Sequence, residues 1–392
     1  MKNWLIKRFL PGMCIVALTV SLAACASAPQ PGQDVDAEAQ ETVQETTPEQ
    51  SEPSATNYGD MTDMSVHVEE LVLTEDWDKV FPRSENVNHR KVTFANHFGV
   101  TLAADLYEPK EYSGLLPAIA VCGAFGAVKE QTSGLYAQEM AERGFLTIAF
   151  DPSFTGESGG YPRNFNSPDI NIEDYQAAVD FLSVQENVDR ERIGLIGICG
   201  WGGMAIQAAA LDTRVKATAV MTMYDMSRNT ALGYFDANDA DARYSDRVAY
   251  NEQRTADYRN GSYALAGGLP ETAPDDAPQF LKDYVDYYKG RGYHPRSQNS
   301  NGGWAATAKG SLMNMRLFEY APEIRNAVLL VHGENAHSLM YSQDAYEKLT
   351  SGAYADNKEL MIIPGASHTD LYDRTDIIPF DKIEDFFRSA IG

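Results

Sequence analysis

Short, almost uninterrupted apolar runs alternate along the chain with longer stretches in which apolar residues recur at helical spacing. Runs of the first kind are typical of strands buried on both faces, and stretches of the second kind are typical of amphipathic helices. The alternation predicts a mostly parallel sheet covered by helices on both faces, an α/β architecture. The expected buried strands cover residues 117–122, 145–150, 193–198, 217–223, 327–331 and 360–363, and the expected helices cover residues 128–143, 172–182, 200–211, 342–350 and 380–391.

Two further regions complete the expected fold. Residues 91–95 and 100–107 read as a strand pair joined by a turn at His97-Phe98-Gly99. Residues 226–323 contain no buried-strand pattern, but they hold Tyr-rich helical patches at 250–258 and 280–288. A loop of that length without structure is unusual in a compact domain. We therefore expect a helical cap inserted after the sixth strand, acting either as scaffolding or as a wall of the substrate pocket.

The N-terminal segment has the organisation of an export signal. Lys2, Lys7 and Arg8 precede an apolar stretch over residues 13–22, and Leu22-Ala23-Ala24-Cys25 follows. This pattern resembles a bacterial lipobox, which implies that residues 1–24 are a lipoprotein signal peptide and that Cys25 is lipidated. An ordinary signal peptide or a membrane-spanning anchor is the alternative, although the apolar run is short for a bilayer.

Residues 25–60 follow as an acidic segment rich in Gln, Glu, Thr, Pro and Ser, with almost no large apolar side chain. Such a segment buries too little apolar surface to offset the entropy lost on ordering. We expect a disordered tether there, then a core in two parts, residues 61–225 and 324–392, separated by the cap over 226–323. The expected location is the cell envelope, on the extracytoplasmic side of the membrane.

The formal net charge is −24 over 392 residues. A field of this sign repels nucleic acid and anionic membrane surfaces. We therefore expect a small-molecule substrate, no nucleic-acid partner, and contact with a membrane only through the lipid anchor. Of the four cysteines, Cys14 lies in the signal and Cys25 at the lipid site. The other two, Cys122 and Cys199, are expected to stay unpaired, because both lie in segments assigned below to the active site.

Cys199 stands where the buried strand 193–198 ends and the helix 200–211 begins. A sharp strand-to-helix turn needs small neighbours and exposes its corner residue above the sheet. The N–H groups at a helix N-terminus favour a thiolate over a thiol. Cys199 is therefore the candidate nucleophile, and a buried packing cysteine is the alternative.

The segment Gly197-Ile198-Cys199-Gly200-Trp201-Gly202-Gly203 resembles the elbow of cysteine-nucleophile α/β-hydrolases of the dienelactone-hydrolase-like group. The likeness extends over residues 92–391 and includes residues 122–131 and Pro364-Gly365-Ala366-Ser367-His368. It implies an α/β-hydrolase fold and an activity on ester bonds. The sequence departs from the usual elbow at Trp201, where a small residue is expected.

The remaining catalytic groups follow from the order of the strands. Two backbone N–H groups must face the developing oxyanion, and we expect Gly200 and either Ala124 or Phe125 to supply them. His368 follows the final strand, where hydrolases of this fold carry their base. His332 ends a buried strand pattern and is expected to be structural.

Two carboxylates are candidates for the acid that orients His368. Glu334 lies in the loop after the seventh strand, where Ala336 occupies the position at which this fold usually carries Asp. Asp225 follows the sixth strand, whose end also faces the site. His337 neighbours the first candidate and is expected to line the pocket.

Residues 151–159 form a Gly- and Ser-rich loop expected to turn the chain and border the site. No metal-ligand spacing or nucleotide-binding fingerprint occurs in a supporting context, so we expect neither metal nor cofactor. The sequence thus predicts a hydrolase that cleaves a carboxylic ester, lactone or thioester through a cysteine acyl-enzyme. The alternatives are an acyltransferase on the same fold and a catalytically idle ligand-binding lipoprotein.

Overall fold

The computed structural model describes residues 65–392. The predicted signal peptide, Cys25 and the predicted tether lie outside the described residues. Within the described residues, no helix combines the length and the apolar character needed to cross a bilayer.

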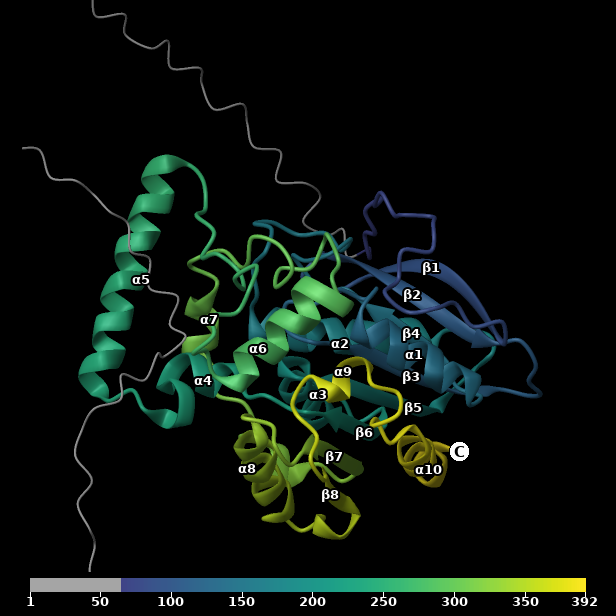
Figure 1. Cartoon of the computed structure of the whole chain (residues 1–392). Coiled ribbons are helices and arrows are strands. Elements are labelled where there is room, and N and C mark those ends of the chain that lie inside the picture. Colours follow the sequence, from purple (N-terminus) through teal and green to yellow (C-terminus); the bar gives the residue numbers. More distant parts are fainter. Residues whose placement is uncertain (1–64) are drawn as a thin grey trace, which may run out of the picture. The chain divides into compact units, whose positions relative to one another are not determined.

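Eight strands form one sheet in the order β1-β2-β4-β3-β5-β6-β7-β8 (Figure 1). The pairs β1–β2 and β2–β4 are antiparallel, and every other neighbouring pair is parallel. This is the predicted α/β-hydrolase architecture. The strands are β1 (Val87–Ala95), β2 (Thr101–Pro109), β3 (Leu116–Cys122), β4 (Leu146–Phe150), β5 (Val188–Ile198), β6 (Val215–Met221), β7 (Ala327–Gly333) and β8 (Lys358–Ile363).

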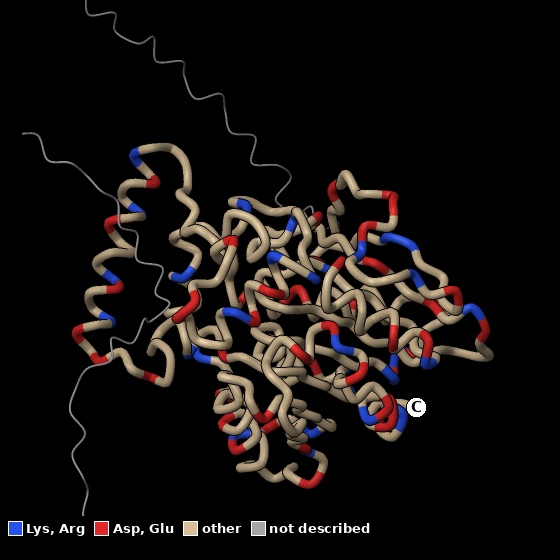
Figure 2. Tube along the Cα trace, in the orientation of Figure 1, with Lys and Arg blue, Asp and Glu red and all other residues tan. Residues whose placement is uncertain are grey.

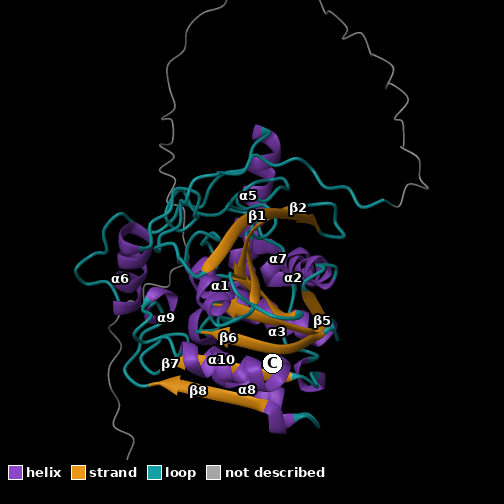
Figure 3. Ribbon diagram, turned by 90° about the vertical axis from the view of Figure 1, so that its right-hand side faces the viewer, coloured by secondary structure: helices purple, strands orange, loops and turns teal. Residues whose placement is uncertain are grey.

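Helices cover both faces of the sheet, as two glycines of β5 demonstrate (Figure 3). Gly194 and Gly197 are three residues apart, so they face opposite sides of the strand. A Cβ atom on Gly194 would lie 2.5 Å from the Phe387 ring of α10, and one on Gly197 would lie 2.7 Å from Cβ of Ala205 in α3. The helices of the core are α1 (Thr132–Glu142), α2 (Pro168–Ser183), α3 (Gly200–Leu211), α8 (Leu339–Thr350), α9 (Asp370–Asp373) and α10 (Phe380–Ile391).

The predicted helical cap lies between β6 and β7. It contains α4 (Met226–Leu232), α5 (Ala240–Asn260), α6 (Gln279–Val285), a π-helical turn (Asp286–Arg291) and α7 (Lys309–Asn314). Helix α5 lies at the outer side of the cap with one buried residue, Asp257 (Figure 1). Helix α6 and the π-helical turn lie beside α9, where Tyr287 and Tyr372 rings are 5.0 Å apart. The cap therefore contacts the core next to His368.

Strand β5 is longer than the sequence pattern predicted. Its first residues, Val188 to Arg192, are mostly polar and partly exposed, whereas residues 193–198 are all buried. The apolar pattern marks only the part of a strand that is covered on both faces. The expected strand 193–198 is therefore the buried half of β5.

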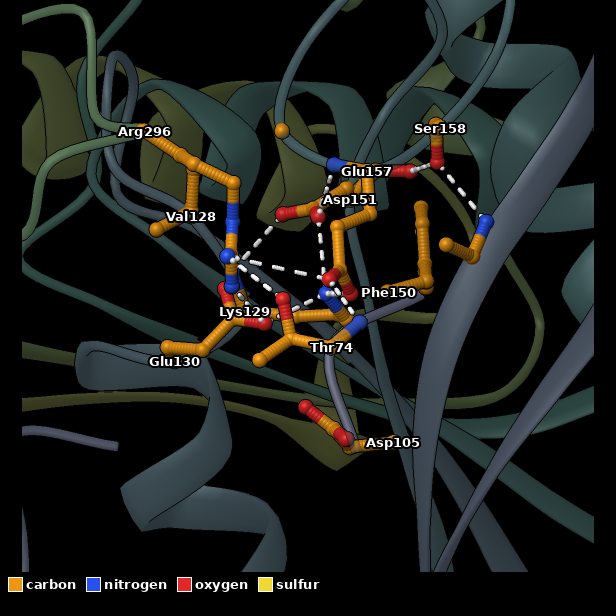
Figure 4. Close-up of polar contacts among 12 residues, drawn as sticks. Thr74, Asp105, Val128, Lys129, Glu130, Phe150, Asp151, Glu157, Ser158 and Arg296 are labelled. Carbon is orange, nitrogen blue, oxygen red and sulfur yellow. Dashed lines mark hydrogen bonds and ion pairs between the residues drawn. The ribbon is translucent and has the colours of Figure 1, made fainter. Parts of the chain in front are cut away.

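A buried group of ion pairs, which we call the ion cluster, links the core to the cap (Figure 4). Lys129 is fully buried, and its Nζ lies 2.5 Å from Glu130, 3.0 Å from Asp151 and 2.6 Å from Glu157. Arg296, from the cap, lies 2.8 Å from Glu130. Asp151 begins the loop expected to border the site, and it pairs with Lys129. The pair places the Asp151 carboxylate in the ion cluster, and the expectation that residues 151–159 border the site stays a prediction.

Arg296 also extends the ion cluster to the segment before β1, since its Nη2 lies 2.6 Å from Asp78. Oxygen atoms of Asp78, Glu130 and Glu157 lie within 4.8 Å of one another, a spacing that a metal ion can also use. Here, among the described residues, four cations pair with these carboxylates: Lys79, Lys91, Lys129 and Arg296. Elsewhere in the described part, acidic and basic residues are interspersed along the chain (Figure 2).

Candidate active site

Cys199 occupies the turn between β5 and α3, with φ 57° and ψ −127°. A positive φ is unfavourable for a residue with a side chain, and it persists only where the surroundings enforce it. Here the N–H of Cys199 donates to the carbonyl of Met221 at 2.9 Å. A Cβ on Gly197 would lie 2.5 Å from the carbonyl oxygen of Trp201, so this turn requires glycine at that position. The structure therefore has the sharp elbow that the sequence predicted.

The Cys199 thiol lies among hydrogen-bond donors, and 5% of the residue is exposed. Burial raises the pKa of the Cys199 thiol above its ordinary value. Hydrogen bonds from the Tyr372 hydroxyl and from the backbone N–H groups of Phe125 and Gly200 act in the opposite direction on that pKa. Of the two alternatives for the second oxyanion donor, Ala124 and Phe125, the structure brings Phe125 to the sulfur.

His368 is buried and is held by three hydroxyl groups. Its Nδ1 lies 2.5 Å from Oγ of Ser338 and 2.9 Å from Oγ1 of Thr222. Its Nε2 lies 3.1 Å from the Tyr372 hydroxyl. Burial lowers the pKa of His368 well below its ordinary value, and the neighbouring His337 and His332 lower it further. Because Tyr372 hydrogen-bonds both His368 and Cys199, it links the predicted base to the predicted nucleophile.

Neither carboxylate proposed as the acid contacts His368 in the described residues. Glu334 is exposed, and its Oε2 accepts the N–H of Gly365 at 2.9 Å, which fixes the turn after β8. Asp225 caps α4, where its Oδ1 accepts the N–H of Arg228 at 2.9 Å. Burial raises the pKa of Asp225. The expectation that one of the two orients the imidazole was wrong, because the turn after β7 presents Ser338 at Nδ1 and directs Glu334 outward.

His332 is connected to the site more closely than the sequence suggested. It lies fully buried one residue before the end of β7, and its Nε2 lies 3.0 Å from Oγ of Ser338, the hydroxyl that also contacts His368. Burial lowers the pKa of His332 to about 3, so the ring is neutral near pH 7. It is therefore linked to the base through one shared hydroxyl.

Trp201, the residue that departs from the usual elbow, is buried. The residue is 2% exposed, and its ring packs 6.4 Å from Tyr175 and 6.5 Å from Phe125. Phe125 also stacks on Trp304 of the cap, with ring centroids 4.4 Å apart. The bulky residue at the elbow therefore packs against the loop that holds Phe125.

Aromatic residues of the cap cover His368 from the other side. Tyr284 of α6 lies 5.4 Å from the His368 ring, and Phe280 stacks on His337 at 4.5 Å. A cavity of about 420 Å³ opens beside them. It is lined by Gln279, Phe280, Asp283, Asn335, His337, Gly365, Ser367, His368 and Asp370. The expectation that His337 lines the pocket is confirmed, and burial lowers the pKa of its ring to about 4.

Sequence reasoning missed Tyr372, Ser338 and Thr222. A signal for Tyr372 existed, since it follows His368 by four residues and helix α9 begins between them. The sequence holds no signal for Ser338 and Thr222, because hydroxyl residues are common in loops. These two residues contact His368 only because the ends of their strands lie side by side in the sheet. Cys122 and Cys199 are both free, as expected.

With this geometry established, residues 99–369 match a family described as X-Pro dipeptidyl-peptidase (S15 family). The chain belongs to the S15 family. S15 membership agrees with the α/β-hydrolase fold and with a hydrolase-type enzyme. The finer resemblance to a dienelactone-hydrolase-like group with a cysteine nucleophile stays a prediction.

Three other proteins illustrate what this S15 chain resembles. Uncharacterized protein PA2218 of Pseudomonas aeruginosa is 56% identical over 321 residues, covering 81% of this chain and 85% of the relative. The PA2218 crystal structure matches with a TM-score of 0.79 at 55% identity, covering 82% of this chain and 99% of PA2218. The α/β hydrolase GrgF from Penicillium shares the fold, with a TM-score of 0.62 at 20% identity and coverage of 78% and 99%. Thiohydrolase aneE of Aspergillus aculeatus is 38% identical over 133 residues, or 34% of this chain and 41% of aneE.

Proposed function

We propose that the protein is a cysteine-dependent acyl hydrolase that cleaves a carboxylic ester, lactone or thioester. The observation that carries the proposal is the position of the Cys199 thiol. It stands on a strained turn at the start of α3, with the N–H groups of Phe125 and Gly200 acting on its sulfur. A reactive nucleophile beside two converging N–H groups is the arrangement that acyl transfer requires.

The reaction would begin with transfer of the thiol proton to Nε2 of His368, directly or through the Tyr372 hydroxyl that contacts both. The sulfur then forms a bond to the substrate carbonyl carbon, and the oxyanion accepts hydrogen bonds from Phe125 and Gly200. Collapse breaks the bond to the leaving group, which takes the proton from His368. Water, deprotonated by His368, releases the acid and restores the thiol.

The resting pair is a neutral thiol and a neutral imidazole in this proposal. Burial raises the pKa of Cys199 and lowers that of His368, so an ion pair is disfavoured before substrate binds. The N–H groups and Tyr372 therefore act mainly on charge that develops during the reaction.

Three kinds of reaction are compatible with these catalytic groups. One relative is named a thiohydrolase, which favours a thioester. The S15 family is described by a dipeptidyl-peptidase activity, which makes a peptide bond the second candidate. An acyltransferase, in which an alcohol or amine replaces water, would use the same groups.

The location is proposed from the sequence. The lipobox pattern ending at Cys25 supports a lipid anchor on the extracytoplasmic side of a bacterial membrane. In that arrangement the catalytic domain acts on substrates outside the cytoplasm.

The test uses the full chain with its signal processed, offered p-nitrophenyl esters, acyl thioesters and Xaa-Pro anilides. We expect hydrolysis of the esters and thioesters. Cys199→Ala should lose this activity, and Cys199→Ser should retain a small fraction of it. Cys122→Ala is the matched control, because Cys122 is also buried and its Sγ contacts only backbone groups of the described residues, the carbonyl of Phe150 at 3.5 Å and the N–H of Gly123. Mass spectrometry of a slow substrate should find the acyl group on Cys199. Wild-type turnover in Cys199→Ala contradicts the proposal, and cleavage of the anilide alone assigns the peptidase activity.

A further inference from the structure

A series of hydrogen-bonded neutral side chains begins at Nδ1 of His368, where a carboxylate was expected. Nδ1 of His368 lies 2.5 Å from Oγ of Ser338, and the same Oγ lies 3.0 Å from Nε2 of His332. Nδ1 of His332 lies 2.7 Å from Oγ of Ser342. Ser338, His332 and Ser342 are fully buried, and we call these three residues the serine–histidine relay.

Only one direction of hydrogen bonding lets His368 act as a base. Nε2 must be free to accept a proton, so the ring carries its hydrogen on Nδ1 and donates it to Ser338. The Ser338 hydroxyl then donates to Nε2 of His332, and Nδ1–H of His332 donates to Ser342. Each donor from His368 to His332 then has an acceptor, and Thr222 Oγ1, 2.9 Å from Nδ1 of His368, accepts in the same direction. The serine–histidine relay therefore fixes the tautomer of His368 that the proposed reaction needs.

Asp283 and Asp370 line the same cavity as His368 but make no hydrogen bond to its ring. The titratable groups in closest contact with the ring offer no negative charge. They are His332 on β7, His337 before α8, Tyr224 after β6, Tyr284 on α6, Tyr372 on α9 and the Cys199 thiol at the start of α3. The histidine rings are neutral near pH 7, because burial lowers the pKa values of His332 and His337 to about 3 and about 4. Within residues 65–392, no carboxylate is hydrogen-bonded to His368.

We infer that Ser338 and His332 are positioning residues that take the role of the triad acid for His368. The inference rests on the proposed function. When Nε2 of His368 accepts the thiol proton, Nδ1–H can move to Ser338 Oγ while the Ser338 proton moves to Nε2 of His332. One N–H and one O–H bond break and one O–H and one N–H bond form, so the positive charge passes to His332. A second imidazole shares the charge that a carboxylate would neutralise.

The experiment measures two quantities on the full chain, turnover of an activated ester and the rate at which iodoacetamide alkylates Cys199, each against pH. Ser338→Ala should lower kcat about tenfold, the effect of one hydrogen bond, with KM nearly unchanged. Ser338→Thr keeps the hydroxyl and should retain most of kcat. Ser133→Ala is the matched control, because Ser133 is also a buried serine and its Oγ makes no hydrogen bond in the described residues.

Ser338→Asp distinguishes a serine that acts on His368 from a serine that only supports the fold. It also provides the test if Ser338→Ala does not fold. A carboxylate beside Nδ1 favours the imidazolium, so the acidic limb of both pH profiles should move to higher pH. His332→Gln leaves an acceptor for Ser338 but no second base, and should lower kcat without shifting that limb upward. Unchanged kcat in Ser338→Ala, or an unshifted limb in Ser338→Asp, overturns the inference. Alkylation reports on Cys199 without an ester substrate, so the outcome is separable from failure of the proposed hydrolase activity.

Discussion

The Tyr372 hydroxyl lies 3.1 Å from Nε2 of His368 and also makes a hydrogen bond to the Cys199 thiol. Tyr372→Phe removes one of the groups that lower the thiol pKa. We expect about a tenfold loss of ester turnover and slower alkylation of Cys199 at pH 7, since one pKa unit changes the thiolate fraction tenfold. Tyr107→Phe is the control, because Tyr107 is fully buried in β2 with no hydrogen bond to its hydroxyl in the described residues. Equal alkylation rates in both variants contradict the assigned contact.

Glu334→Gln and Asp225→Asn should leave ester turnover within about twofold of wild type, since neither carboxylate touches the base and both substitutes keep the same shape. Asn caps helices nearly as well as Asp, so α4 should persist in Asp225→Asn. Steady-state kinetics with melting temperatures give the comparison. A tenfold loss in either variant at unchanged melting temperature would restore a carboxylate as the acid.

Lys129→Met should destabilise the fold strongly. It leaves Glu130 and Asp151 buried without their nearest cation, and breaking a buried pair in this way costs about 3–5 kcal/mol. Lys216→Met is the control, because Lys216 is partly exposed and lies 3.9 Å from Glu191, a pair worth at most about 1 kcal/mol. Urea unfolding measures both. Equal midpoints would mean that the ion cluster contributes no more than a surface pair.

Stability should fall as the pH is lowered from about 6.5, the pKa of an unfolded histidine. His332 has a native pKa of about 3, so between these values only the unfolded chain binds the proton. The contribution of His332 is therefore present above about pH 6.5 and declines by at most about 1.4 kcal/mol per pH unit below it. His332→Gln removes this contribution. Unfolding free energies at pH 7 and pH 5 should differ less in the variant than in wild type, and parallel pH dependences would contradict the buried neutral ring.

Cys25→Ala should abolish lipid labelling and release the protein from the membrane fraction, while ester turnover stays at the wild-type level. The reason is the lipobox reading of residues 22–25, which lie outside the described residues. Metabolic labelling with a fatty-acid analogue and cell fractionation provide the measurement. Continued labelling of the variant would exclude Cys25 as the acylated residue.

The fold was predictable because its signals are local. Strands covered on both faces leave continuous apolar runs, and α10 buries Phe380, Ile383, Phe387 and Ile391 at helical spacing. The exposed half of β5 and the π-helical turn of the cap leave no such pattern. Their conformations depend on neighbours that are distant in the sequence.

The site residues also fall into two groups, those that the sequence locates and those that depend on distant neighbours. Cys199, Gly200, Phe125 and His368 each lie in the first few residues after a strand, so the order of strands locates them. Ser338 meets His368 across the ends of β7 and β8, 30 residues apart. The expected acids, Glu334 and Asp225, also follow strand ends, but the premise that the base needs a carboxylate is wrong here, because two buried hydroxyls occupy Nδ1 of His368.

The ion cluster also sets an order of events during synthesis. Arg296 bonds Asp78 across 218 residues and Thr74 across 222, so the segment before β1 has no partner for these contacts until most of the chain has emerged. Contacts of such separation form late, after the local helices and hairpins. In the export that we propose from the lipobox pattern, Thr74 and Asp78 would cross the membrane before Arg296, so these contacts would form only after the cap had followed.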